Sequence, residues 1–430
     1  MVSDGEYFQA AVEVANGRIS AIHRNRSNAA DPSGPVLDAT DALILPGFVQ
    51  CHVHVVQSLL RHQADGLELL DWLRLRTWPY EAALSGDDVF AAARLGITEL
   101  LCGGTTTALD FGTTHHHDRV FEAAEQLGIR FVSGLTHMDE GDGAPDALLR
   151  PPAESLDEAA SLGERWHGAA NGRISYAVAP RFALSCSAEL LEASVQLARS
   201  HGWLIQTHAS ENRGEIDEVR RRFGCSNIEY LHRHGLTGHD VVLAHGVHLE
   251  PSEIELLART GTRICHCPGT NLKLASGIAD VVTMLAAGVV VGLGADGAPC
   301  NNRLSAFHEM SLAGTLHGLR HGPTALSPWK VLALATRDGA RALHLDGEIG
   351  TLEVGKRADL VVIDARDWAM QPGGNPASRI VYGATSAQVR HAVVDGRPVV
   401  IDGRPVAVNP RDVLECAQAA WTATAKRMEM

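Results

Sequence analysis

The middle of the chain alternates between apolar, strand-like runs and helix-like patterns. The runs end near residues 54, 112, 136, 181, 210, 248, 268 and 297, and helix-like patterns such as 89–102 and 188–201 lie between most of them. Eight strands that alternate with helices are typical of a (β/α)8 barrel, a fold of roughly 250 residues. We therefore predict an α/β fold whose main domain, residues 46–349, is a TIM-type (β/α)8 barrel. The apolar run 42–45 is interpreted as the lead-in to the first barrel strand.

Both ends of the chain differ from this middle. Asn16-Gly17 separates two short alternating segments, which is a hairpin signal, and residues 350–406 contain similar segments. We predict that residues 1–45 and 350–430 together form one small β-sandwich domain, which includes a C-terminal helix.

The composition argues against several classes of protein. The net charge of −14 disfavours a nucleic-acid-binding surface, which needs clustered basic residues. Every apolar run is shorter than the length of about 18 residues that a membrane-spanning helix needs. The N-terminus lacks the basic and then apolar residues of a secretion signal. Eight cysteines in 430 residues are no disulfide framework. We expect a soluble, cytoplasmic protein that binds neither nucleic acid nor membrane, and we interpret Cys265-His266-Cys267 as part of a strand rather than as a metal site.

Several of the apolar runs end in a side chain that can bind a metal. The first ends in His52 and His54, and residues i and i+2 of an extended chain point to the same side. The fifth ends in His208, the sixth in His245 and the eighth in Asp296. Because the carboxyl ends of barrel strands meet at one mouth, these side chains should converge there. Their donors suit a zinc ion with three or four protein ligands and an open position.

Glu211 follows the fifth run, three residues beyond His208. Bound zinc lowers the pKa of its water to about 7, so a nearby carboxylate that is not a ligand could take that proton and pass it to a leaving group. The alternative for Glu211 is a solvated residue that opens the next helix.

Longer motifs resemble the amidohydrolase superfamily, in its cytosine/guanine deaminase and triazine-hydrolase branch. The resemblance covers nearly the whole chain and is carried by PGFVQCHVH (46–54), GGTTT (103–107), QTHASEN (206–212), LAHGVHL (243–249), CPGTNLKLASGIAD (267–280), LGADGAPCNN (293–302) and IGTLEVGKRADLVVID (349–364).

This resemblance implies a zinc-dependent aminohydrolase, in which a metal-bound hydroxide attacks an amino-substituted heterocycle and ammonia is released. It implies one zinc per subunit, with Fe²⁺ as the alternative, and the ligands His52, His54, His208 and Asp296. Asp296 would also be the first base, Glu211 would move protons to the ring nitrogen and the departing amine, and His245 would hydrogen-bond the attacking hydroxide or the forming oxyanion.

Other residues resemble those with which guanine deaminases bind their substrate. They are Gln57, Trp72 within the segment 70–81, and Arg181-Phe182. In that family the arginine binds a ring acceptor and the phenylalanine stacks on the heterocycle, which suits a planar ring that carries amide groups. The favoured substrate is therefore guanine or a related oxo-purine or pterin. Arg181 and Phe182 also have simpler interpretations, a salt bridge and a core position. Arg181 stands where dinuclear relatives carry a lysine, so no bridging carbamate is expected.

The segment after the eighth run favours other substrates. Residues 297–302, which include Asn301 as a candidate substrate ligand, and residues 304–312 resemble methylthioadenosine/adenosylhomocysteine deaminases and triazine hydrolases. The alternatives are thus a nucleoside deaminase of that type, or an s-triazine chlorohydrolase or aminohydrolase. Glu211 favours deamination, because a leaving amine must be protonated whereas chloride leaves unaided. A non-catalytic scaffold is disfavoured, because every expected ligand is present. Relatives also imply a homo-oligomer, a dimer or larger.

The roles of two further histidine positions stay open. His115-His116-His117 is predicted to be a solvated loop, with contact at the barrel mouth as the alternative. His266 either contacts the ligand or packs in the core.

Overall fold

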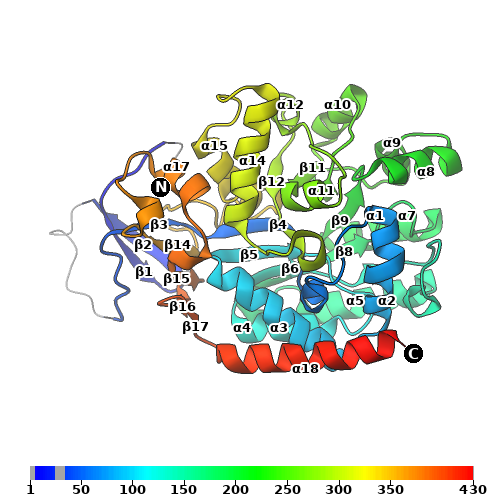
Figure 1. Cartoon of the computed structure of the whole chain (residues 1–430), viewed down its shortest axis with the longest axis horizontal. Helices are drawn as coiled ribbons and strands as arrows, with labels where there is room; N and C mark the ends of the chain where they lie inside the picture. The colour runs from blue at the N-terminus through cyan, green and yellow to red at the C-terminus, as the bar shows by residue number, and fades with distance from the viewer. Residues whose placement is uncertain (1–4, 25–33, 430) are drawn as a thin grey trace.

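The computed structural model describes residues 5–24 and 34–429, and its centre is a closed barrel of parallel strands (Figure 1). The barrel strands, in the order in which they pair, are β4 (Phe48–His54), β5 (Thr105–Asp110), β6 (Arg130–Ser133), β8 (Ile174–Pro180), β9 (Leu204–Ala209), β10 (Val241–His245), β11 (Arg263–His266) and β12 (Val291–Leu293). The pairing of Leu293 on β12 with Gln50 on β4 closes the ring. The predicted TIM-type barrel is thereby confirmed.

Helices cover the outside of the barrel (Figure 1). Those that lie between successive strands are α3 (Gly86–Cys102), α4 (Asp118–Leu127), α5 (Pro152–Trp166), α7 (Ala188–His201), α8 (Arg213–Phe223), α9 (Asn227–Arg233), α10 (Pro251–Thr260) and α12 (Val281–Ala286), and α14 (Ala306–His321), α15 (Pro328–Leu334) and α16 (Arg337–Ala342) follow the last strand. The strands β10 and β12 are buried along their whole length, and apart from His245 at the end of β10 they consist of apolar residues and glycine. The continuous apolar runs in the sequence have this cause.

Short elements extend the strands at the mouth of the barrel. β7 (Thr136–His137) pairs with β8, and β13 (Asp296–Gly297) pairs with the end of β4. Asp296 thereby lies beside Val53, next to the two histidines of β4.

A second, antiparallel sheet combines strands from both ends of the chain. Its strands pair in the order β17 (Arg404–Pro405), β16 (Arg397–Ile401), β15 (Val389–Val394), β14 (Leu360–Asp364) and β3 (Ala42–Pro46). The predicted hairpin is present as β1 (Ala11–Ala15) and β2 (Arg18–His23). Ile19 of this hairpin shares an apolar cluster with Leu360 and Val362, so the two sheets pack as the predicted small β-sandwich.

The run 42–45 is not the lead-in to the first barrel strand, as predicted, but part of β3, which pairs with β14. The chain changes sheets at Gly47, where a Cβ atom would lie 2.0 Å from Thr106 Oγ1, so glycine alone fits. Gly47 N donates to the carbonyl oxygen of Asp359 at 3.0 Å, and β4 begins one residue later. The close approach of Gly47 to Thr106 therefore separates two strands, β3 and β4, that the sequence pattern had joined into one run.

The division into two domains at the predicted boundaries stays a prediction, and residues 1–4, 25–33 and 430 of the predicted sandwich segments lie outside the described residues. The C-terminal helix α18 (Pro410–Met428), which the sequence assigned to the sandwich, lies along α3 of the barrel (Figure 1). Its Ala417 joins the apolar cluster of α3.

Asp359, in the tail motif, forms a buried ion pair with the barrel. Its carboxylate accepts hydrogen bonds from Arg130 Nε at 2.7 Å and Arg130 Nη2 at 3.1 Å, and from Asp395 N at 2.7 Å. The side chains of Arg130 and Asp359 are only 5% and 1% exposed. Removing one partner of such a pair leaves a buried charge without compensation.

We therefore predict that Asp359→Ala lowers the free energy of unfolding by about 3–5 kcal/mol. Urea denaturation followed by circular dichroism measures this change. The control is Glu415→Ala, which removes a carboxylate that is 64% exposed and pairs with the exposed Arg411, and it should cost at most about 1 kcal/mol. Equal denaturation midpoints for both variants would contradict the role assigned to the buried pair.

Candidate metal centre and active site

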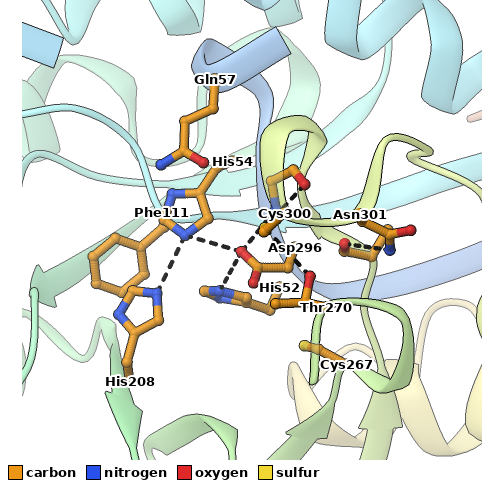
Figure 2. A network of polar contacts seen from close by, with 12 residues as sticks. His52, His54, Gln57, Phe111, His208, Cys267, Thr270, Asp296, Cys300 and Asn301 are labelled. Atoms are coloured by element: carbon orange, nitrogen blue, oxygen red, sulfur yellow. Dashed lines mark hydrogen bonds and ion pairs between the residues drawn. The ribbon is translucent and has the colours of Figure 1, made fainter. Parts of the chain in front are cut away.

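The carboxyl ends of the barrel strands bring the predicted metal ligands together. In Figure 2 the rings of His54 and His208 face each other, and the Asp296 carboxylate lies beside His52 and His54. His54 Nε2 lies 3.2 Å from His208 Nε2. Asp296 Oδ1 lies 3.4 Å from His54 Nε2 and 3.5 Å from His52 Nε2.

These separations fit one shared zinc ion. Ligand atoms at about 2.0–2.1 Å from a tetrahedral ion are roughly 3.3 Å from one another. The ligand atoms of His52, His54 and Asp296 all lie within 4.8 Å of one another, and so do those of His52, His208 and His245. Among the described residues the buried His52 Nε2 has no hydrogen-bond partner of good geometry, since Asp296 Oδ1 lies 3.5 Å away, and a bound metal between the two atoms would explain this.

His208 is oriented by a contact behind the ring. Its Nδ1 lies 2.7 Å from the carbonyl oxygen of Arg181. Because a carbonyl can only accept, Nδ1 carries the hydrogen and Nε2 keeps a lone pair for a metal. The ring of Phe111 supports this arrangement, since its centroid lies 4.3 Å from that of His208 and 5.2 Å from that of His54.

The electrostatics favour the protonation states that metal binding requires. Burial opposes ionisation of Asp296, but hydrogen bonding by His52 and the charges of His52 and His54 hold its pKa well below the usual value. Burial, followed by the charge of His52, lowers the pKa of His54 well below that of free imidazole. The cluster therefore offers a carboxylate and neutral imidazole, the forms that bind metals.

Backbone strain marks the same strand ends. Ser210, His245 and Asp296 have φ angles of 52°, 75° and 61°, in the left-handed region that residues other than glycine rarely adopt. Each such residue costs about 1–3 kcal/mol, and such strain clusters at functional sites. His245 and Asp296 both reach the metal cluster from these turns.

Glu211 lies beside the cluster, at 3.4 Å from Oε2 to His245 Nε2. The residue is 3% exposed, and burial, followed by the charges of Asp296 and Glu215, raises the pKa of its carboxyl well above the usual value. The solvated alternative for Glu211 is therefore wrong. A buried carboxylic acid next to a reacting centre can deliver a proton.

A cavity opens onto the cluster. Its lining consists of His54, Gln57, Leu69, Trp72, Leu73, Arg181, Phe182, His208, Glu211, Glu215, His245, Leu274 and Asp296. Four of the five predicted substrate ligands thus line the cavity. Asn301 does not: it lies beyond Cys300 in Figure 2, and its Nδ2 donates to Ala295 O at 2.8 Å and to Glu309 Oε1 at 2.7 Å. The prediction that Asn301 binds substrate therefore lacks geometric support, because its amide is engaged in holding the chain beside Asp296.

A buried polar network supports one wall of the cavity: Gln57 and Arg181 line the cavity, and Glu81, outside the lining, binds both of them. Arg181 Nη1 donates to Glu81 Oε2 at 2.5 Å and Arg181 Nη2 to Glu81 Oε1 at 3.2 Å, while Gln57 Nε2 donates to Glu81 Oε1 at 3.0 Å. The side chains of Arg181 and Glu81 are 5% and 7% exposed. The simpler interpretation of Arg181 as a salt-bridge partner is thus correct, and the residue lines the cavity as well. Phe182 also lines the cavity and is a core residue.

The comparison with known proteins starts from a family model. The model of the amidohydrolase family matches residues 43–399. The chain belongs to the amidohydrolase family. The 5-methylthioadenosine/S-adenosylhomocysteine deaminase of Desulforudis audaxviator is 39% identical to this amidohydrolase over 436 residues, which cover 99% of this chain and 96% of the relative.

Two solved structures extend the comparison. The guanine deaminase of E. coli is 32% identical with a TM-score of 0.84, and the alignment covers 91% of this chain and 92% of that one. An adenosine deaminase from Xanthomonas campestris with bound zinc is 30% identical with a TM-score of 0.87, over 97% of this chain and 94% of that one. With the metal cluster, these relatives identify a metal-dependent hydrolase that acts on C–N bonds and confirm the predicted deaminase branch. Within the described residues of this amidohydrolase, no helix has the length and apolar character to cross a membrane.

The remaining histidines of this amidohydrolase lie outside the cavity lining. His115 Nε2 contacts the carbonyl oxygen of Ala147 at 2.6 Å, whereas His117 is fully buried against Ser133, so the run is only partly a solvated loop. His266 is buried, and its ring lies 5.4 Å from that of His317. The core interpretation of His266 is therefore the one the structure supports.

Sequence reasoning missed several residues that shape this site. Glu215 lines the cavity, and its carboxylate accepts from Glu211 N at 2.8 Å. The spacing from Asn212 to Glu215 is a capping-box signal that could have revealed it. Phe111 and Asn271 lie in or beside recognised motifs, but no local signal distinguishes them from ordinary core residues.

Proposed function

We propose that this amidohydrolase removes the amino group of a purine-like ring, and that guanine or a related oxo-purine is its preferred substrate. The observation that carries this proposal is the polar pair Gln57 and Arg181, which line the cavity beside the metal cluster and are both held by Glu81. A guanidinium and an amide in fixed positions match the acceptors and donors along the edge of an oxo-purine. Phe182 supplies an aromatic surface for the ring.

The roles follow from the geometry of the cluster. The ligands of a zinc ion would be His52, His54, His208 and Asp296. When bound, zinc supplies a Lewis acid that polarises and acidifies water. Asp296 would take the first proton of the attacking water, whose oxygen replaces the amine on the ring carbon. Glu211 would protonate the ring nitrogen and then the amine, so that the C–N bond breaks and ammonia leaves. His245 would hydrogen-bond the reacting oxygen.

A second candidate substrate is a 5′-modified adenosine. It is favoured by the names of the relatives, among them the deaminase of Desulforudis audaxviator at 39% identity.

The test is a panel of substrates given to the zinc-loaded protein. Guanine, 8-oxoguanine, isoxanthopterin, methylthioadenosine and adenosine are each assayed for ammonia, and kcat/KM is compared. We expect the highest value for an oxo-purine or pterin. A highest value for methylthioadenosine or adenosine would favour the second candidate, and no ammonia from any of them would refute the deaminase proposal. The Asp296→Ala protein, purified in the same way, controls for contaminating deaminases.

Other expectations stay predictions. They are the s-triazine alternative, which chloride release from atrazine would test, a homo-oligomeric state, a cytoplasmic location and the lack of a nucleic-acid partner.

A further inference from the structure

His245 lies at the end of β10 with one ring nitrogen turned to the reacting centre. Its Nε2 is 3.4 Å from Glu211 Oε2 and 3.9 Å from Asp296 Oδ2. The residue is fully buried, and among the described residues its Nε2 has no hydrogen-bond partner. Whether this nitrogen carries a hydrogen therefore decides whether it donates a hydrogen bond to a reacting molecule or accepts one.

The other ring nitrogen has a defined partner. Nδ1 of His245 lies 3.0 Å from Oδ1 of Asn271. An amide oxygen only accepts, so this contact requires the hydrogen on Nδ1. Neutral imidazole carries one such hydrogen, and Nε2 is then left with a lone pair.

Asn271 is rigidly held in the short helix α11 (Pro268–Lys273). Its backbone N donates to Cys267 O at 3.0 Å, and its backbone carbonyl accepts from Ser276 N at 2.8 Å and Gly277 N at 3.2 Å. The residue is fully buried and does not line the cavity. Its hydrogen bond to His245 therefore links Asn271 to the reacting centre.

We propose that Asn271 is a positioning residue that holds His245 in the tautomer with hydrogen on Nδ1, so that Nε2 accepts a hydrogen bond from the attacking water. This inference rests on the proposed deaminase function. Because the partner is an amide rather than a carboxylate, it orients the ring without adding a buried charge. Loss of a partner that orients a histidine typically costs 10–100-fold in activity.

The first test compares two substitutions in the zinc-loaded protein with the best substrate of the panel. Asn271→Leu keeps a similar volume but removes the acceptor, and kcat should fall about 10–100-fold while KM and zinc content stay unchanged. Asn271→Asp keeps an oxygen acceptor at the same place and should recover most of that loss. The matched control is Ser276→Ala in the same loop, which removes a buried hydroxyl that has no partner among the described residues and should keep the wild-type kcat.

Several outcomes would overturn the proposal. A wild-type kcat in Asn271→Leu excludes the positioning role, and an Asn271→Asp protein as slow as the leucine variant excludes the acceptor role. If Asn271→Leu fails to fold or loses zinc, Asn271→Asp decides alone: a kcat near that of the wild type supports the proposal, and a loss of about 10–100-fold overturns it.

A second measurement needs no substrate. The ring nitrogens of ¹⁵N-histidine-labelled, zinc-loaded protein are observed by NMR, and the His245 signals are assigned by their absence from a His245→Gln protein. We expect hydrogen on Nδ1 and none on Nε2, whereas the reverse would overturn the inference. This readout stays valid if the substrate panel yields no ammonia, so failure of the inference and failure of the proposed function are distinguishable.

Discussion

Replacing Glu211 by glutamine should lower the turnover of this amidohydrolase by roughly 10²–10⁴-fold, the contribution expected of a general acid–base group. The carboxyl of Glu211 is buried 3.4 Å from His245, and burial and the charge of Asp296 raise its pKa, so it can hold and deliver a proton. Glutamine has nearly the same shape but cannot transfer a proton. Steady-state kinetics of Glu211→Gln measures its turnover, and zinc analysis measures whether the variant still binds the metal.

The control for this variant is Glu253→Gln. Glu253 is also buried and accepts a backbone hydrogen bond from Glu250 N at 2.8 Å, but it does not line the cavity. Its turnover should equal that of the wild type. Unchanged turnover in Glu211→Gln would refute the proton-shuttle role. Loss of zinc from that variant would instead make Glu211 a metal ligand.

Removal of the metal should also lower the activity strongly. A Lewis acid contributes several kcal/mol to the transition state, and each 1.36 kcal/mol is a factor of ten, so chelated protein should lose roughly 10³-fold or more of its activity. Addition of about one equivalent of Zn²⁺ should restore it, as one tetrahedral site requires. The thermal midpoint should fall on chelation and recover with zinc, because the ion binds only the folded cluster.

Two variants locate the metal. Asp296→Ala removes a ligand atom that lies 3.4 Å from His54 Nε2, and it should reduce zinc content together with activity. The double variant Cys265→Ala, Cys267→Ala should keep its zinc, since these buried cysteines belong to none of the potential metal-binding groups among the described residues. Full zinc content and activity in Asp296→Ala would show that the carboxylate is no ligand.

Local sequence patterns were enough to predict the convergence of the metal-binding side chains. The His-x-His pair on β4 converges because alternate residues of a strand share a face. His208 and Asp296 join it because barrel strands all end at the same mouth. Both rules depend only on spacing along the chain, so the metal cluster was predictable before any contact was known.

Other features depend on contacts that no local pattern encodes. Arg181 and Glu81 are 100 residues apart in sequence, and only the folded barrel reveals that Glu81 holds Arg181 in the wall of the cavity. The same limit explains why the prediction for Asn301 lacks support. The motif indicated a substrate ligand, but in the folded chain the amide of Asn301 donates a hydrogen bond to Glu309.

The sequence by itself determined the barrel and predicted that His52, His54, His208 and Asp296 converge at its mouth with Glu211 nearby, because each of these features follows from strand periodicity or from a long motif. Only the tertiary structure decided that residues 42–45 belong to the small sheet, that α18 lies on the barrel, and that Asn271 reaches His245. The physical reason is that shape and burial in the folded chain decide which side chains become partners. A single sequence does not indicate which residues far apart along the chain will be in contact.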